Sequence, residues 1–125
     1  MPYRVTVEAR FEAAHFLLHF RGQPEPLHGH SYRVEVVVES AALDPDDLAV
    51  DFAAARDLVR GIAAELDYRN LNDHPAFAGR NTSAENLARY FSDRVQASGS
   101  LVPGRVAEVT VWEGPENRAS FRPKG

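Results

Sequence analysis

Two stretches of the chain alternate apolar and polar residues, and this period of two constrains the fold more than any other feature. In residues 3–15 (YRVTVEARFEAAH), odd positions from Val5 to Phe11 are apolar and even positions from Arg4 to Glu12 are polar or charged. Residues 30–40 (HSYRVEVVVES) repeat the pattern. Because successive side chains of a strand point to opposite faces of a sheet, the alternation predicts two long, half-buried strands.

Two later segments show the period of amphipathic helices. Residues 51–66 begin with Asp51, which we expect to be an N-cap, and residues 82–97 begin with Thr82 and Glu85, the spacing of a capping box. The apolar stripes comprise Phe52, Ala55, Leu58, Val59, Ile62 and Leu66 in the first segment, and Ala84, Leu87, Phe91 and Val95 in the second. Each stripe predicts a helix with one buried side.

The order of these elements indicates the fold class. Residues 105–113 and 118–123 read as a hairpin around GPEN. The resulting order is strand, strand, helix, helix, strand, strand (ββααββ), without repeats or linkers. Because strands and helices do not alternate, we predict one α+β domain over residues 1–125, with an antiparallel sheet covered on one face.

Composition restricts the class of partner. The net charge is −4 and the chain holds no cysteine, which argues against a non-specific nucleic-acid binder and excludes thiolate ligands and a cysteine nucleophile. No apolar run approaches the length of a membrane span, and MPYRVTVEAR lacks the apolar region of a signal peptide. We therefore expect no membrane partner and a cytoplasmic location.

Three of the five histidines fall on the apolar faces of the predicted strands. His15 continues the parity of the first strand, and His28 and His30 share the apolar face of the second if that strand starts early. Three imidazoles that converge beside an apolar wall suit tetrahedral zinc with an open fourth position. The alternative is a set of hydrogen-bonded histidines without a metal. We expect His19 to serve the loop and His74 to lie at the surface.

Glu113 is an unexpected residue at the end of an apolar face. It shares its parity with Ala107, Val109 and Val111, where a carboxylate is costly unless it is paired. One interpretation is that the strand end frays and Glu113 turns to solvent. The other is that its carboxylate accepts hydrogen bonds from a ligand with adjacent N–H donors, like the edge of a guanidine.

Six segments, taken in order, resemble those of one enzyme family: FEAAH, LHGHSYRVEV, VDF, ELDYRNLND, NTSAENLA and VTVWEGP. Over nearly its whole length the chain resembles the 6-pyruvoyltetrahydropterin synthase and 6-carboxy-5,6,7,8-tetrahydropterin synthase family. The resemblance implies the tunnelling fold, a four-stranded antiparallel sheet with two helices on one face. It also implies a homo-oligomer, typically a hexamer of two trimers with active sites at subunit interfaces, and a small-molecule substrate, 7,8-dihydroneopterin triphosphate.

The resemblance also implies roles for individual residues. His15, His28 and His30 match the three zinc ligands of the family. Glu113 matches the acid that anchors the 2-amino-pyrimidinone edge of the pterin. These assignments agree with the interpretation from strand parity, in which zinc with an open position lies near a carboxylate that recognises N–H donors.

The chain departs from the family at its proton-transfer residues. Pro24 stands where the family usually has a cysteine base, and Tyr68 stands where a histidine usually follows the aspartate that is retained here as Asp67. Glu25 directly follows the missing cysteine. A branch of the family with glutamate in this region releases 6-hydroxymethyl-7,8-dihydropterin by a retro-aldol step. We therefore predict Glu25, Asp67 and Tyr68 as catalytic residues.

The sequence leaves three functions open. The first is a zinc-dependent lyase that uses Glu25. The second is 6-carboxytetrahydropterin synthase activity, as in queuosine biosynthesis, with a rearranged base. The third is a zinc protein without catalysis, which either binds a pterin or uses the metal only to support its fold.

Overall fold

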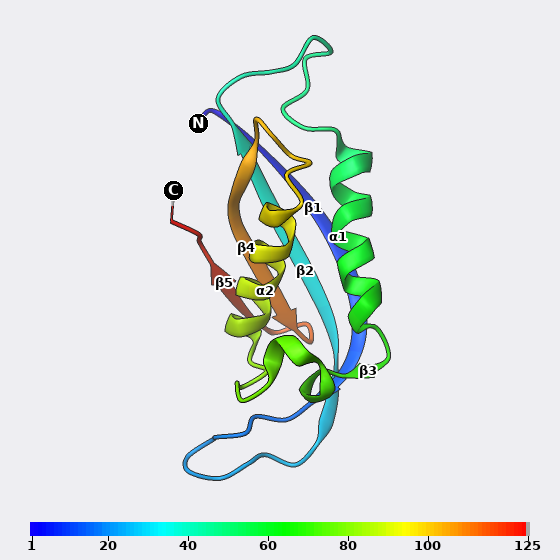
Figure 1. Cartoon of the computed structure of the whole chain (residues 1–125), viewed down its shortest axis with the longest axis vertical. Helices are drawn as coiled ribbons and strands as arrows, with labels where there is room; N and C mark the ends of the chain where they lie inside the picture. The colour runs from blue at the N-terminus through cyan, green and yellow to red at the C-terminus, as the bar shows by residue number, and fades with distance from the viewer. Residues whose placement is uncertain (125) are drawn as a thin grey trace.

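Two long strands form the centre of the sheet in the computed structural model, which describes residues 1–124 (Figure 1). β1 (Tyr3–His15) and β2 (His28–Ser40) each contain 13 residues and pair antiparallel along their whole length. The alternation of exposed and buried residues along both strands confirms the prediction from period two. β2 begins at His28 rather than at His30, so the strand includes both histidines of HGH.

The sheet has five strands in a mixed arrangement, so the predicted four-stranded antiparallel sheet is only partly right. β4 (Arg105–Glu113) pairs antiparallel with β2, and β5 (Asn117–Phe121) pairs antiparallel with β4. The order is β3-β1-β2-β4-β5. The added strand, β3 (Arg69–Asn70), is two residues long and pairs parallel with β1. Two residues are too few to show a period, which is why the sequence did not predict this strand.

Both predicted helices are present and cover one face of the sheet (Figure 1). α1 (Phe52–Leu66) begins after Asp51, whose carboxylate accepts hydrogen bonds from two backbone amides of the first turn, as predicted. The first residue of the predicted stripe, Phe52, is nevertheless 57% exposed, so the buried side of the helix begins only at Ala55. Two short 3-10 turns, η1 (Leu71–Asp73) and η2 (Pro75–Phe77), follow.

The predicted capping box of the second helix is wrong. α2 (Ala84–Ala97) is capped by Ser83, whose side chain accepts a hydrogen bond from the Asn86 amide. Thr82 is instead fully buried and bonds to His15. The pattern placed a hydroxyl at the correct end of the helix, but a neighbouring hydroxyl makes the cap.

The core lies between the sheet and the two helices. Its largest fully buried apolar side chains are Tyr32, Phe91, Leu66, Leu71 and Leu87, packed with valines of β2, β4 and both helices. A register shift between Val37 and Val38 interrupts the pairing with β4. As a result Val106 is buried in the place where parity alone predicted Ala107. The bulge changes the parity only of the β4 residues that precede Glu108. Glu113 lies after the bulge and keeps its predicted face.

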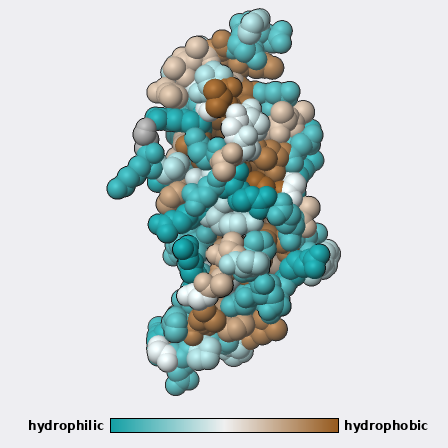
Figure 2. All heavy atoms as spheres, viewed as in Figure 1, coloured by the Kyte–Doolittle hydropathy of each residue, from teal (hydrophilic) through white to brown (hydrophobic). Residues whose placement is uncertain are grey.

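Polar residues cover most of the helical side of the surface, and apolar groups gather near the two ends of the long axis (Figure 2). Phe20 and Leu27, in the loop between β1 and β2, are exposed at one end, and Leu43 and Leu48 are exposed in the loop before α1 at the other. Within the described chain, neither helix is both long and apolar enough to cross a membrane.

Candidate functional site

Three histidines converge where β1 ends and β2 begins. His15 lies directly opposite His28, and His30 lies opposite Ala13, so strand register places the three rings on the same face. One ring nitrogen from each histidine lies within 4.8 Å of the others. The structure therefore brings together the cluster that strand parity predicted. Whether the cluster can bind a metal depends on which ring nitrogens keep a free lone pair.

The hydrogen bonds of the rings leave metal-binding nitrogens available. Nδ1 of His15 donates to the Thr82 carbonyl at 2.8 Å, and Nδ1 of His28 donates to the Pro26 carbonyl at 2.8 Å. Because a carbonyl oxygen only accepts, each Nδ1 carries the proton and each Nε2 keeps a lone pair. Within residues 1–124, the buried Nε2 atoms of His15 and His30 have no hydrogen-bond partner. Two imidazoles oriented in this way, with the unpaired Nε2 of His30 beside them, fit a divalent metal.

The electrostatics favour the neutral form of the most buried ring. Burial lowers the pKa of His15, and this outweighs the hydrogen bond to Thr82 and the charge of Glu113, which both raise it. A neutral imidazole is the form that binds a metal. His15 is only 2% exposed, so its ring is held in a fixed environment.

A polar network behind His15 fixes that ring. The hydroxyl of Thr82 lies 3.1 Å from His15 Nδ1 and donates toward the Phe16 carbonyl and the Asn72 side chain, each at 3.2 Å. Asn72 in turn accepts from the Phe16 amide and donates to the Phe16 carbonyl. These supporting roles leave no local pattern in the sequence, because they join positions far apart in the chain.

Two further clamps hold the loop that follows β1. Asn81 makes a matching pair of hydrogen bonds with the backbone of His19, which lies in this loop. Glu25 accepts from the Leu17 amide through Oε1 at 2.9 Å, while its own amide donates to the Leu17 carbonyl at 2.9 Å. These bonds fix one oxygen of the Glu25 carboxylate and place the residue beside the histidines.

A cavity of about 270 Å³ lies beside the histidine cluster, and several of the predicted site residues line it. His15, His28, Glu25 and Glu113 line it, together with the first turn of α2 and the start of β5. Glu113 does not turn to solvent. Its Oε1 lies 3.4 Å from His30 Nε2 and its Oε2 lies 3.8 Å from His15 Nε2. The cavity thus combines imidazole nitrogens, the helix N-terminus, the carboxylate residues Glu25, Glu85 and Glu113, and the guanidinium residue Arg118.

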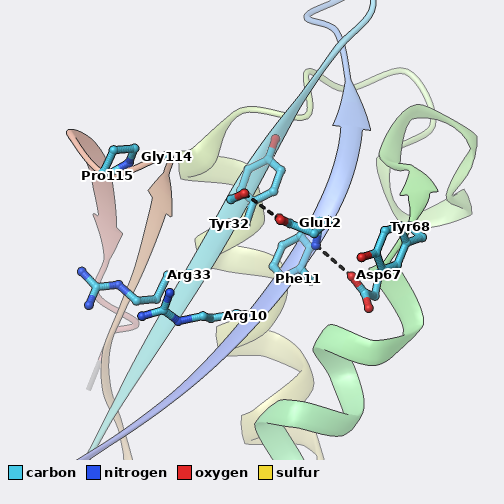
Figure 3. Close-up of a pocket in the computed structure, with 10 residues that line it drawn as sticks. Arg10, Phe11, Glu12, Tyr32, Arg33, Asp67, Tyr68, Gly114 and Pro115 are labelled. Atoms are coloured by element: carbon cyan, nitrogen blue, oxygen red, sulfur yellow. Dashed lines mark hydrogen bonds between the residues drawn. The ribbon is translucent and has the colours of Figure 1, made fainter.

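Asp67 and Tyr68 do not line this cavity. The Asp67 carboxylate accepts from the Glu12 amide at 2.8 Å, and the Tyr68 amide donates to the Glu12 carbonyl at 2.6 Å. Tyr68 has a positive φ of 56° and is 83% exposed. Both residues line a separate cavity of about 530 Å³ beside Arg10 and Arg33 (Figure 3). Within one chain, the structure separates them from Glu25.

Tyr32 occupies a position that the alternating pattern of β2 marks as apolar. Its ring stacks on Phe11 with centroids 4.8 Å apart and meets His15 and His30 edge-on at 6.0 and 5.6 Å. The side chain is 1% exposed, and its hydroxyl has no hydrogen-bond partner in the described part of the chain. Burial, followed by the charges of Glu113 and Glu25, raises the pKa of Tyr32, so the hydroxyl keeps its proton.

His74 is a structural residue. Its Nδ1 accepts from the Ala76 amide at the start of η2, and its ring packs against Phe77 and Tyr90. It is partly buried rather than at the surface, and it does not line the histidine cavity.

Comparison with known proteins gives the family of the chain. The family model described as 6-pyruvoyl tetrahydropterin synthase matches residues 4–124. Dihydroneopterin monophosphate aldolase of Pyrococcus furiosus is 34% identical over 118 residues, covering 93% of this chain and 94% of that protein. 6-carboxy-5,6,7,8-tetrahydropterin synthase of Aquifex aeolicus is 28% identical over 160 residues, covering 98% and 99%.

Solved structures show the same fold. A catalytic residue mutant of Plasmodium vivax 6-pyruvoyltetrahydropterin synthase, in which alanine replaces glutamate, has a TM-score of 0.82 at 21% identity and covers 97% of both chains. The match of the family model over nearly the whole sequence, together with the identity to the aldolase, establishes the relationship. The chain belongs to the 6-pyruvoyl tetrahydropterin synthase family.

Proposed function

We propose that this protein is a zinc-dependent lyase that cleaves the side chain of a phosphorylated 7,8-dihydroneopterin and forms 6-hydroxymethyl-7,8-dihydropterin. The observation that carries the proposal is the position of Glu25. Its carboxylate lines the same cavity as His15 and His28, although it lies in a loop and not on either strand. The site therefore has a carboxylate base beside a metal-binding cluster where the family usually has a cysteine.

Zinc is the metal that suits these ligands. His15, His28 and His30 each offer one ring nitrogen, and two of the rings are oriented by backbone carbonyls. Three histidines with an open fourth position are typical of catalytic zinc sites. Zinc in such a site stabilises negative charge that develops on a substrate oxygen.

The remaining walls suit the ring of a pterin. Glu113 offers a carboxylate that accepts from adjacent N–H donors, such as the 2-amino group and the neighbouring ring nitrogen. The first turn of α2 lines the same cavity, and backbone N–H groups in a first turn lack acceptors within the helix. These groups would bind the carbonyl oxygen of the same ring edge.

The proposed reaction is a retro-aldol cleavage. Glu25 takes the proton of the 2′-hydroxyl, the bond between C1′ and C2′ breaks, and C2′ leaves as the aldehyde of a two-carbon fragment that carries the phosphate. The electron pair moves from the broken bond into the conjugated ring, and protonation at C1′ gives the hydroxymethyl product. The hydrogen bond from the Leu17 amide fixes the position of the carboxylate, which is what a general base requires.

One relative favours this branch, and a second protein supports the use of a glutamate in catalysis. The name of the Pyrococcus furiosus relative describes an aldolase that acts on dihydroneopterin monophosphate. The Plasmodium vivax structure concerns an enzyme with a glutamate as catalytic residue. The first of these makes the monophosphate a substrate to test beside the triphosphate that the family resemblance implies.

The roles proposed for Asp67 and Tyr68 require a second subunit. Since neither residue lines the Glu25 cavity within one chain, they can act there only if a neighbouring copy brings them to it. We therefore include a homo-oligomer, with a hexamer as the expected state, in the proposal. Light scattering coupled to size-exclusion chromatography measures its mass.

The deciding experiment supplies zinc-loaded protein with 7,8-dihydroneopterin monophosphate and, separately, the triphosphate, and identifies the pterin products by chromatography. The hydroxymethyl product supports the proposal. A carboxyl or pyruvoyl product would support the synthase alternative, which the Aquifex aeolicus relative represents. Pterin binding without turnover would support the non-catalytic alternative.

Glu25→Gln tests the proposed base. Glutamine keeps an oxygen that can accept from the Leu17 amide, so the loop should stay in place. We expect a loss of about 10²- to 10⁴-fold in kcat, the usual contribution of a general base, with unchanged zinc content. The control is Glu116→Gln, which neutralises an exposed carboxylate outside the cavity. Retained turnover in Glu25→Gln would assign the base elsewhere.

A further inference from the structure

The hydroxyl of Tyr32 has no role in the fold that a phenylalanine would not fill. The ring accounts for the packing, since it stacks on Phe11 and contacts His15 and His30 through its edges. The hydroxyl itself is buried without a partner within residues 1–124. Leaving such a group unpaired typically costs about 1–3 kcal/mol. An unpaired buried hydroxyl therefore needs a partner that the folded chain does not supply.

The location of the hydroxyl points to that partner. Figure 3 shows the Tyr32 side chain directed along β2 toward the end of the sheet where β1 stops. Within residues 1–124, the other buried side-chain polar atoms without a partner are the Nε2 atoms of His15 and His30. The Tyr32 ring meets both of these rings edge-on. Tyr32 therefore lies beside the histidine cluster, although it lines the neighbouring cavity of about 530 Å³.

The chemistry of the neighbouring groups restricts what Tyr32 can bind. The carboxylates of Glu25 and Glu113 accept hydrogen bonds, whereas the Nε2 lone pair of His15 serves the metal. Tyr32 adds a protonated hydroxyl, which donates. A ligand hydroxyl can donate to a carboxylate and, at the same time, accept from Tyr32. The pterin ring needs no such group, because Glu113 and the first turn of α2 already serve its edge.

We propose that the Tyr32 hydroxyl donates a hydrogen bond to a side-chain hydroxyl oxygen of the bound ligand, and so distinguishes pterins with a hydroxylated side chain from those without one. This inference rests on the proposed function. Tyr32 is then a substrate-contacting residue that neither strand parity nor the family resemblance assigned.

The test crosses one substitution with two ligands. Tyr32→Phe removes only the oxygen, and Tyr3→Phe, at the far end of β1, is the matched control. Binding of 7,8-dihydroneopterin and of 6-methyl-7,8-dihydropterin to the zinc-loaded proteins is measured by calorimetry. We expect Tyr32→Phe to lower the affinity for 7,8-dihydroneopterin by about three- to tenfold, the effect of losing one neutral hydrogen bond. The affinity for the 6-methyl compound should not change.

The outcomes separate this inference from the proposed function. If the parent protein binds both pterins and Tyr32→Phe binds both equally well, the inference is overturned and the proposed function stands. An equal loss of affinity for both ligands would show that the Tyr32 hydroxyl acts on Glu113, which holds the ring. That result would also overturn the inference. If the parent protein binds neither pterin, the proposed function fails and the inference fails with it. Zinc content and melting temperature should not fall in Tyr32→Phe, which shows that the fold and the metal site are intact.

Discussion

The two faces of the sheet differ in whether their polar side chains have partners. On the solvated face, Arg33 lies over the Trp112 ring and near two glutamates, and the Trp112 indole donates to Glu35 at 2.8 Å. On the helical face, around the histidine cluster, buried side-chain atoms of His15, His30 and Tyr32 have no hydrogen-bond partner in the described chain. Paired polar groups can be explained by the fold alone, whereas unpaired buried groups indicate a ligand.

The largest expected effect is the loss of the metal from the unpaired cluster. His28→Ala removes one of three ligands, so zinc content after dialysis should fall from about one per chain, the expected occupancy of a three-histidine site, to a small fraction. Arg33→Ala, on the solvated face, should keep its zinc. Elemental analysis by mass spectrometry checks both. Full zinc content in His28→Ala would show that the cluster does not hold the metal.

Glu113→Gln sharpens the comparison within the cavity. Its carboxylate is within 3.4 Å of His30 Nε2, so it is either a ligand anchor or a fourth metal ligand. We expect pterin affinity to fall by about 10- to 100-fold, because a charged hydrogen-bond acceptor is lost, with zinc retained. Calorimetry gives the affinity and elemental analysis the zinc. Loss of zinc in this variant would assign the carboxylate to the metal instead.

Substitution of two threonines compares a hydroxyl that holds the histidine site with a hydroxyl that pairs two strands of the sheet. Thr82→Val removes a buried hydroxyl from the network around His15, and we expect a loss of about 1–3 kcal/mol in unfolding free energy. Zinc affinity should fall only slightly, since the Thr82 carbonyl still accepts from His15. Thr110→Val removes a hydroxyl that pairs with Ser120 at 2.7 Å on the other face. Urea unfolding should show the smaller loss there, and equal losses would contradict the distinction.

The smallest effect belongs to an exposed pair between the helices. Arg94 bonds to Glu65 and lowers the pKa of that carboxyl. A lowered carboxyl pKa stabilises the fold above the ordinary value of 4.5, and this contribution disappears as the pH falls through the lowered value. Because both side chains are largely exposed, solvent screening limits the contribution to at most about 1 kcal/mol.

Glu65→Gln should therefore unfold slightly more easily at neutral pH and lose less stability than the parent protein in acid. Thermal unfolding at several pH values measures this, and Glu116→Gln is the control for removal of an unpaired charge. An unchanged acid profile would show that the pair contributes nothing. Turnover should stay at the parent level, since neither residue lines the cavity.

Strand parity predicted the helical face of the sheet and the convergence of the histidines, because side-chain direction in a strand depends only on position along the chain. It could not predict β3 or the bulge opposite Val37, which depend on contacts between distant segments. The spacing of Thr82 and Glu85 predicted a helix cap. The bond that Thr82 makes instead, to His15, crosses 67 positions of sequence and leaves no local pattern. The pattern counted Tyr32 as apolar, which describes its ring but not its oxygen.

The paired hydrogen bonds of Asn72 make the site sensitive to slow chemical ageing. Asn72 donates to the Phe16 carbonyl through the one side-chain atom that hydrolysis of an amide replaces with oxygen. Conversion to aspartate would place two acceptors against each other and add a negative charge beside Thr82, which orients His15. A stored sample could therefore lose metal affinity without any break in the chain, and the lesion would appear as a mass increase of about one dalton on the peptide that contains Asn72.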